Sequence, residues 1–140
     1  VNQRADVAAR VDAEGVHLPE NSLPAAQLRQ TWPQLLWLGQ SRHDRKGLLA
    51  SQEEQASYAF LSPIFEVPGK GAGVGIDGFQ QATAGVRIPV YALGGITVER
   101  ARDLRDAGAY GVAVKRAVYR ASHPSEVISQ LLEVFDKSTP

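Results

Sequence analysis

The chain reads Pro89-Val90-Tyr91-Ala92-Leu93-Gly94-Gly95-Ile96-Thr97, an apolar run that ends in two glycines. Such an unbroken apolar run is typical of a buried parallel strand. Thr97 stands where a helix would be capped, and a second apolar run begins at Gly111. Paired glycines let the backbone approach a ligand closely, and the helix N-terminus after them presents N–H groups to it. In (βα)8 barrels the loops after the last two strands commonly form a phosphate site of this kind. The pattern predicts a phosphate-handling α/β barrel, or a piece of one.

Strand-like and helix-like segments alternate along the whole chain. The apolar runs lie at 15–18, 35–38, 58–61, 90–93 and 112–114. Helical patterns are found at 3–11, 24–30, 44–56, 77–84, 98–107 and 124–135. The alternation predicts a parallel sheet with covering helices. A closed barrel needs eight strands and typically about 250 residues. We therefore expect about five βα units of a parallel (βα)8 TIM-barrel type fold, with a five-stranded flavodoxin-like sheet as the alternative.

The composition is that of an ordinary globular protein, and residues 1–140 are predicted to form a single domain. Fifteen basic and fifteen acidic residues give a formal net charge of zero, so no global field attracts nucleic acid or a membrane. The chain has no cysteine, which excludes disulfides and thiolate chemistry. No apolar run is long enough to span a bilayer, and without a visible signal peptide the expected location is cytoplasmic. The chain starts at Val1 and has no methionine, so we expect it to be truncated or processed at its N-terminus.

Seven short segments carry a resemblance to a known family. They are 2–8, 15–18, 41–43, 62–65, Lys70, 88–96 and 107–114. In this order and near these spacings, they resemble the thiamine phosphate synthase and thiazole tautomerase superfamily of compact (βα)8 barrels. Aligned in this way, the chain starts at the end of the family's third strand. The first two strands and most of the third would then be missing.

The resemblance implies a thiamine phosphate synthase-like transferase of thiamine biosynthesis. Such an enzyme joins hydroxymethylpyrimidine diphosphate to thiazole phosphate and releases pyrophosphate. This chemistry mainly needs charge stabilisation on the leaving group and accurate placement of the nucleophile. The expected partners are small-molecule phosphate and pyrophosphate substrates, with a homodimer as a further possibility that the family suggests.

Four residues stand at positions in the part of the family's site that holds phosphate. Gly94 and Gly95 match a glycine pair whose backbone N–H groups bind the thiazole phosphate, although a tight turn would also explain them. Lys115 and Arg116 stand at the end of the next predicted strand, where the family usually has a small or apolar pair. Two cations at that rim could strengthen anion binding, or could equally be solvated surface charges.

Three further residues match catalytic positions of the family. Lys70, in the glycine-rich loop 66–75, matches a lysine that reaches the pyrophosphate. Ser41 matches a serine near the pyrophosphate, and Asn2 matches the asparagine of an Asn-Asp pair.

The family's Mg²⁺ acids are not matched in this sequence. Gln3 replaces the aspartate of the Asn-Asp pair, and Ser22 stands at the second aspartate position, with Glu20 nearby. Because Mg²⁺ prefers carboxylate and phosphate oxygens, its binding is in doubt and no metal ligand is assigned.

Two alternative functions remain open within the superfamily. A thiazole tautomerase would need a histidine where Pro63 stands, although Leu23 resembles tautomerase-like sequences. A non-catalytic member would keep the glycine pair and bind a phosphate ligand without turnover. Among the other residues with functional chemistry, His17 is expected to serve in structural hydrogen bonding, and Trp32 and Trp37 in core packing.

Overall fold

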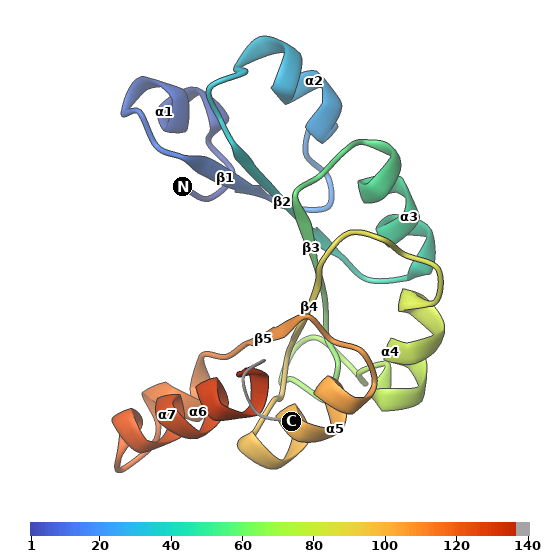
Figure 1. Ribbon diagram of the computed structural model, residues 1–140, viewed down its shortest axis with the longest axis vertical. Helices are drawn as coiled ribbons and strands as arrows, with labels where there is room; N and C mark the ends of the chain where they lie inside the picture. The colour runs from blue at the N-terminus through green and yellow to red at the C-terminus, as the bar shows by residue number, and fades with distance from the viewer. Residues whose placement is uncertain (137–140) are drawn as a thin grey trace. The chain divides into compact units, whose positions relative to one another are not determined.

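The computed structural model describes residues 1–136, which divide into two compact units (Figure 1). Unit 1 comprises residues 1–61 and 82–90. Unit 2 comprises residues 62–81 and the chain from Tyr91 onward. The predicted single domain over 1–140 stays a prediction, and its last four residues lie outside the described part.

Unit 1 alternates helices and parallel strands. Its elements are α1 (Ala5–Arg10), β1 (Gly15–Leu18), α2 (Ala25–Thr31), β2 (Trp37–Arg42), α3 (Arg45–Glu53) and β3 (Tyr58–Leu61). β1 pairs with β2 and β2 pairs with β3, both in parallel. Helix α1 packs on β1, and α3 packs on β2 and β3 (Figure 1). The core is aliphatic, and Leu18, Leu28, Leu35 and Leu38 are almost fully buried in it.

Unit 2 continues the same alternation. It contains most of α4 (Gly75–Thr83) and of β4 (Val90–Leu93), followed by α5 (Val98–Asp106), β5 (Gly111–Ala113), α6 (Arg116–Tyr119) and α7 (Pro124–Phe135). β4 and β5 pair in parallel, and α5 packs against α7. Thr97 caps α5 as predicted, because its Oγ1 accepts a hydrogen bond from the backbone N–H of Arg100 at 3.4 Å.

The five predicted strands are all present. β1, β3 and β4 have the predicted bounds, and β5 lies within one residue of them. The prediction for the second strand was wrong in position, because the apolar run 35–38 precedes most of β2. β2 runs on through Gln40, Ser41 and Arg42, whose polar side chains conceal a strand in the sequence. No helix in the part of the chain that the structure describes is long and apolar enough to cross a membrane.

Two further corrections concern single residues. Lys115 and Arg116 were predicted to end the last strand, and this was wrong because a short helix that was not predicted, α6, begins there. Lys115 is the N-cap of α6 and Arg116 is its first residue. Trp32 packs against the core as predicted, but Trp37 is 57% exposed. Trp37 opens β2 with its side chain outward, and Leu38 takes the inward position instead.

Candidate functional site

A sharp turn joins β4 to α5 and requires glycine at both of its positions. Gly94 has φ of 109° and Gly95 has φ of 66°, in the left-handed region that other residues avoid. A Cβ atom on Gly94 would lie 3.0 Å from Cα of Pro63, and one on Gly95 would lie 2.8 Å from Cβ of Phe65. The backbone of this turn is therefore packed directly against residues 63–65.

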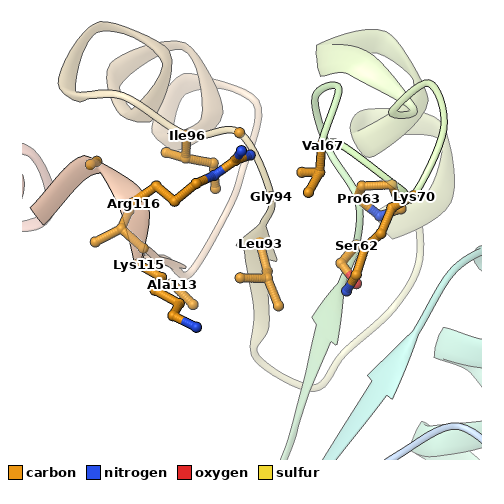
Figure 2. A pocket seen from close by; sticks show the side chains of 13 residues that line it. Ser62, Pro63, Val67, Lys70, Leu93, Gly94, Ile96, Ala113, Lys115 and Arg116 are labelled. Atoms are coloured by element: carbon orange, nitrogen blue, oxygen red, sulfur yellow. The ribbon is translucent and has the colours of Figure 1, made fainter. Parts of the chain in front are cut away.

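The turn forms one wall of a cavity of about 400 Å³ within unit 2 (Figure 2). Thirteen residues line it: Ser62, Pro63, Val67, Lys70, Leu93, Gly94, Gly95, Ile96, Ala113, Val114, Lys115, Arg116 and Ala117. Five of the seven residues assigned to phosphate binding or catalysis from the sequence thus lie on a single cavity. Its size is typical of a small-molecule site.

Every charged residue among those lining the cavity is basic. They are Lys70, Lys115 and Arg116, and no carboxylate is among the lining residues that the structure describes. In Figure 2 the guanidinium of Arg116 extends toward Ile96 and Gly94, and the Lys70 side chain runs toward Ser62. Cations that share a concave wall raise the local positive potential. The cavity is therefore suited to an anion, although the chain has no net charge.

The loop that carries Lys70 is anchored at both ends. The N–H groups of Val74 and Gly75 donate to the carbonyls of Pro63 and Ile64, at 3.1 Å and 2.8 Å. Within the loop, the Lys70 N–H donates to the Val67 carbonyl at 2.9 Å. The loop therefore has a defined base, while Lys70 is exposed near its tip.

Ser41 belongs to unit 1, where it contacts a histidine. Nε2 of His17 lies 2.9 Å from Oγ of Ser41, and Nδ1 lies 3.3 Å from the hydroxyl of Tyr58. The His17 ring also packs against Tyr58 and Phe60, with centroid distances of 5.7 Å and 4.7 Å. Partial burial lowers the pKa of His17 and raises the pKa of Tyr58, which favours the neutral form of both. The prediction that His17 is used for hydrogen bonding is confirmed.

Asn2 also belongs to unit 1, beside β1. It forms an isolated parallel bridge with His17, and the next residue, Gln3, donates its N–H to the His17 carbonyl at 2.7 Å. Asn2 and Ser41 thus both adjoin His17 of β1 in unit 1, whereas the cavity belongs to unit 2. The catalytic roles assigned to Asn2, Ser41 and Lys70 stay predictions.

The described residues do not fit a Mg²⁺ site. They contain no group of three or more histidine, aspartate or glutamate side chains that could hold a metal ion. Glu20 is 3.5 Å from Nε2 of His43, and Ser22 donates to the carbonyl of Leu23 at 3.2 Å. The Glu20 carboxylate thus faces an imidazole and the Ser22 hydroxyl is bonded to a neighbouring carbonyl, and no step proposed below depends on the ion.

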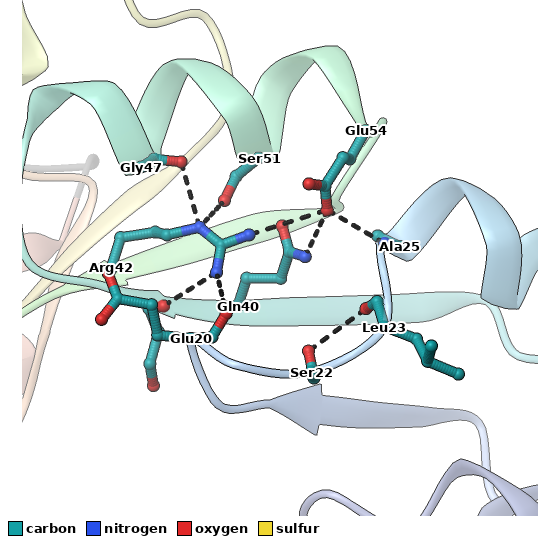
Figure 3. A network of polar contacts seen from close by, with 10 residues as sticks. Glu20, Ser22, Leu23, Ala25, Gln40, Arg42, Gly47, Ser51 and Glu54 are labelled. Carbon is teal, nitrogen blue, oxygen red and sulfur yellow. Dashed lines mark hydrogen bonds and ion pairs between the residues drawn. The ribbon is translucent and has the colours of Figure 1, made fainter.

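A second cluster of polar residues, in unit 1, was not found from the sequence. Arg42 is only 6% exposed, and its Nε donates to Oγ of Ser51 at 2.8 Å and to the Gly47 carbonyl at 3.0 Å (Figure 3). Its Nη1 donates to the Glu20 and Ser41 carbonyls at 3.3 Å and 3.2 Å. The guanidinium is thus surrounded by acceptors.

Glu54 provides the charge that balances Arg42. Its Oε2 lies 3.6 Å from Nη2 of Arg42 and accepts hydrogen bonds from Nε2 of Gln40 at 2.7 Å and from the backbone N–H of Ala25 at 3.1 Å. The carboxylate therefore links β2, α3 and the start of α2 (Figure 3). This cluster, Arg42 with Gln40, Ser51 and Glu54, is referred to below as the Arg42 network.

Comparison with protein families supports the resemblance seen in the sequence. Residues 1–118 match the model of a family described as thiamine monophosphate synthase. A thiamine-phosphate synthase of Chlorobium luteolum is 37% identical over 97% of this chain and 66% of its own length. The thiamine-phosphate synthase of Chloroflexus aurantiacus is 38% identical over 94% of this chain and 62% of its own length. The chain thus spans slightly less than two thirds of these relatives.

A solved structure gives the same result for the fold. The structure of a thiamine phosphate pyrophosphorylase from Pyrococcus furiosus matches this chain with a TM-score of 0.85 and 28% identity. The match covers all of this chain and 68% of the Pyrococcus chain. Five parallel strands alternate with helices, as in this barrel-type neighbour. The predicted α/β fold of the (βα)8 type is confirmed.

Proposed function

The chain belongs to the thiamine monophosphate synthase family, and we propose that the native protein is a thiamine phosphate synthase. It would join hydroxymethylpyrimidine diphosphate to thiazole phosphate and release pyrophosphate. The observation that carries this proposal is the basic cavity of unit 2, built on the turn of Gly94 and Gly95. Because the chain spans only part of its relatives' length, the activity is proposed for the native protein and a binding role for this chain.

The cavity is proposed to hold the phosphate of the thiazole substrate. Backbone N–H groups at the turn and the start of α5 would donate to phosphate oxygens, as at other helix N-termini that bind phosphate. Arg116 extends toward the turn and would add a charge-assisted hydrogen bond. Lys115 at the rim contributes to the same positive potential.

Lys70 and Ser41 are proposed to act on the leaving group. The C–O bond between the pyrimidine methylene and the diphosphate breaks, and the electron pair leaves with pyrophosphate. The nitrogen lone pair of the thiazole then forms a C–N bond to the resulting pyrimidine cation. Lys70 and Ser41 would stabilise the charge that develops on pyrophosphate, and Asn2 would contribute a polar contact.

Two other functions receive different support. The tautomerase is disfavoured because Pro63 lines the cavity where that branch has a histidine, and a pyrrolidine ring cannot transfer a proton. A non-catalytic phosphate binder is favoured by one observation, the replacement of both Mg²⁺ acids by Gln3 and Ser22. A homodimer is proposed from the family resemblance and from the strand edges that an unclosed barrel would expose, and sedimentation velocity would test it.

An assay of thiamine phosphate formation tests the proposal. The native full-length protein is supplied with both substrates, with and without Mg²⁺, and thiamine phosphate and pyrophosphate are quantified. We expect equal amounts of the two products and a drop of about tenfold or more in kcat/KM for Lys70→Ala, or about 1.4 kcal/mol. Lys46→Ala, which removes an exposed lysine of α3, is the matched control and should leave the rate unchanged. Binding of thiazole phosphate without turnover would support the non-catalytic binder, and no binding would overturn both.

A further inference from the structure

Arg100 contacts Gly95, which lines the cavity, and Phe65, which lies between lining residues in the sequence, without lining the cavity itself. It is the third residue of α5, and its Nη1 donates to the Gly95 carbonyl at 2.6 Å. Its guanidinium carbon lies 4.3 Å from the ring centroid of Phe65, over the face of the ring. One side chain therefore joins the glycine turn to the segment that precedes the Lys70 loop.

The hydrogen bond to Gly95 fixes the orientation of one peptide plane. In a trans peptide, the carbonyl of Gly95 and the N–H of Ile96 point in opposite directions. Ile96 lines the cavity, and Gly95 adopts a left-handed conformation that is, for glycine, one of many of similar energy, so an outside contact is needed to select it. By holding the carbonyl, Arg100 sets the direction of the Ile96 N–H, and it polarises that N–H as a donor.

The contact with Phe65 restrains the segment that leads into the Lys70 loop. The Phe65 N–H donates to the Gly94 carbonyl at 3.1 Å, so the backbone of this segment is already hydrogen-bonded to the glycine turn. Phe65 is followed at once by loop 66–75, which carries Lys70. A guanidinium lying on the Phe65 ring limits the movement of that ring and of the loop's first residues.

We propose that Arg100 is a positioning residue of the anion site, which aligns the glycine turn with the Lys70 loop. The role needs arginine in particular, because a planar guanidinium can donate along its edge while its face stacks on a ring. A lysine could not make both contacts. The ligand part of this inference rests on the proposed function, whereas the mechanical part does not.

Limited proteolysis tests the mechanical part. Trypsin cleaves after Lys70, which is exposed and followed by Gly71, and the fragment ending there can be followed by mass spectrometry. We expect Arg100→Ala and Arg100→Lys to raise the initial cleavage rate after Lys70 by at least threefold. Arg102→Ala is the matched control, since Arg102 is an exposed arginine of the same helix, and should behave as wild type. Equal rates for the Arg100 variants and the control would overturn the proposal.

A second variant and a binding measurement complete the test. Phe65→Leu keeps the Gly95 hydrogen bond but removes the ring, and it should also raise the rate of cleavage after Lys70. This variant tests the same contact from the other side if an Arg100 variant fails to fold. In calorimetric titration of the native protein with thiazole phosphate, Arg100→Ala and Arg100→Lys should weaken binding about tenfold, and Arg102→Ala less than twofold. If wild type does not bind, the proposed function fails while proteolysis still decides the role of Arg100. If wild type binds thiazole phosphate but replacement of Arg100 changes neither the cleavage rate nor the affinity, the inference about Arg100 fails and the proposed function stands.

Discussion

The Arg42 network of unit 1 and the basic cavity of unit 2 use arginine in opposite ways. Arg42 is buried and surrounded by hydroxyl and carbonyl acceptors, and the Glu54 carboxylate balances its charge. Arg116 is exposed at the start of a short helix and lines a cavity in which every described charged residue is basic. Arg42 is thus neutralised within the fold, whereas Arg116 presents its charge to the cavity, where we propose that a phosphate binds.

The comparison shows that the partners of a charged residue indicate its role better than its charge does. A buried arginine must be paired and hydrogen-bonded, so its replacement should change stability. An arginine at an exposed rim contributes little to stability, so its replacement should change binding. The four predictions below test this distinction, beginning with the largest expected effect.

Removal of Arg42 should cause the largest loss of stability. Arg42→Leu leaves the partly buried Glu54 carboxylate without its balancing charge, and we expect a loss of about 3 kcal/mol. Urea denaturation followed by circular dichroism measures the change. Lys46→Leu, an exposed position in the same unit, is the control and should stay within about 0.5 kcal/mol of wild type. An Arg42→Leu variant as stable as this control would contradict a structural role for the network.

Replacement of Gly95 should affect both stability and binding. Gly95→Ala introduces a Cβ atom 2.8 Å from Cβ of Phe65 at a φ of 66°. Gly108→Ala is a matched control, because Gly108 has a φ of 92° but no atom within 4 Å of the added Cβ. Both variants should lose about 1 kcal/mol of folding stability from backbone strain. Gly95→Ala alone should lose further stability from the steric contact with Phe65, and it alone should weaken thiazole phosphate binding tenfold or more. Equal effects at the two glycines would show that the turn is not part of a binding site.

Neutralisation of the rim should change binding without changing stability. We expect Arg116→Ala to weaken thiazole phosphate binding about tenfold, since a charge-assisted hydrogen bond contributes about 1.5 kcal/mol or more. Lys115→Ala should have a smaller effect, because its side chain extends past Ala113 and not toward Gly94 (Figure 2). Calorimetry at two salt concentrations gives the affinities, and thermal unfolding gives the stability. A loss of stability with unchanged affinity would place Arg116 in the same class as Arg42.

The smallest effect is a dependence of stability on pH through His17. Burial lowers the pKa of His17 below its ordinary value of 6.5 in the folded chain. As the pH falls, His17 therefore takes up a proton in the unfolded chain before it does so in the folded chain. The contribution of His17 to stability is complete above about pH 6.5 and is lost as the pH falls through the folded pKa. His17→Gln should flatten the decrease in melting temperature between pH 7.5 and 5. An unchanged slope in this variant would assign the pH dependence to other groups.

The sequence predicted the apolar strands and the glycine turn because these follow local rules. Val90–Leu93 is a run of apolar residues, and the pair of glycines marks the turn in any context. The position of β2 was not predictable by the same rules. Its burial depends on Arg42 meeting Ser51 nine residues away and Glu54 twelve residues away, which no local pattern reveals. Likewise, helix α6 has only four residues, too few for a helical period.

Most of the candidate site was predictable from the glycine pattern, from the family resemblance and from the cations of the next predicted strand end. The glycine pair and Lys70 were assigned by resemblance, and the structure places them on one cavity with Lys115 and Arg116. Arg100 was missed because an exposed arginine in a helix is ordinarily a solvated charge. Its role depends on two contacts, with Gly95 and with the ring of Phe65, that exist only in the folded chain.

The most direct test of the account is a calorimetric titration of thiazole phosphate into the native protein and into its Arg116→Ala variant. The account predicts saturable binding with one site per chain, and a dissociation constant about tenfold higher in the variant at unchanged melting temperature. Equal binding by the two proteins, or no binding by either, would contradict the claim that the basic cavity of unit 2 is the phosphate site.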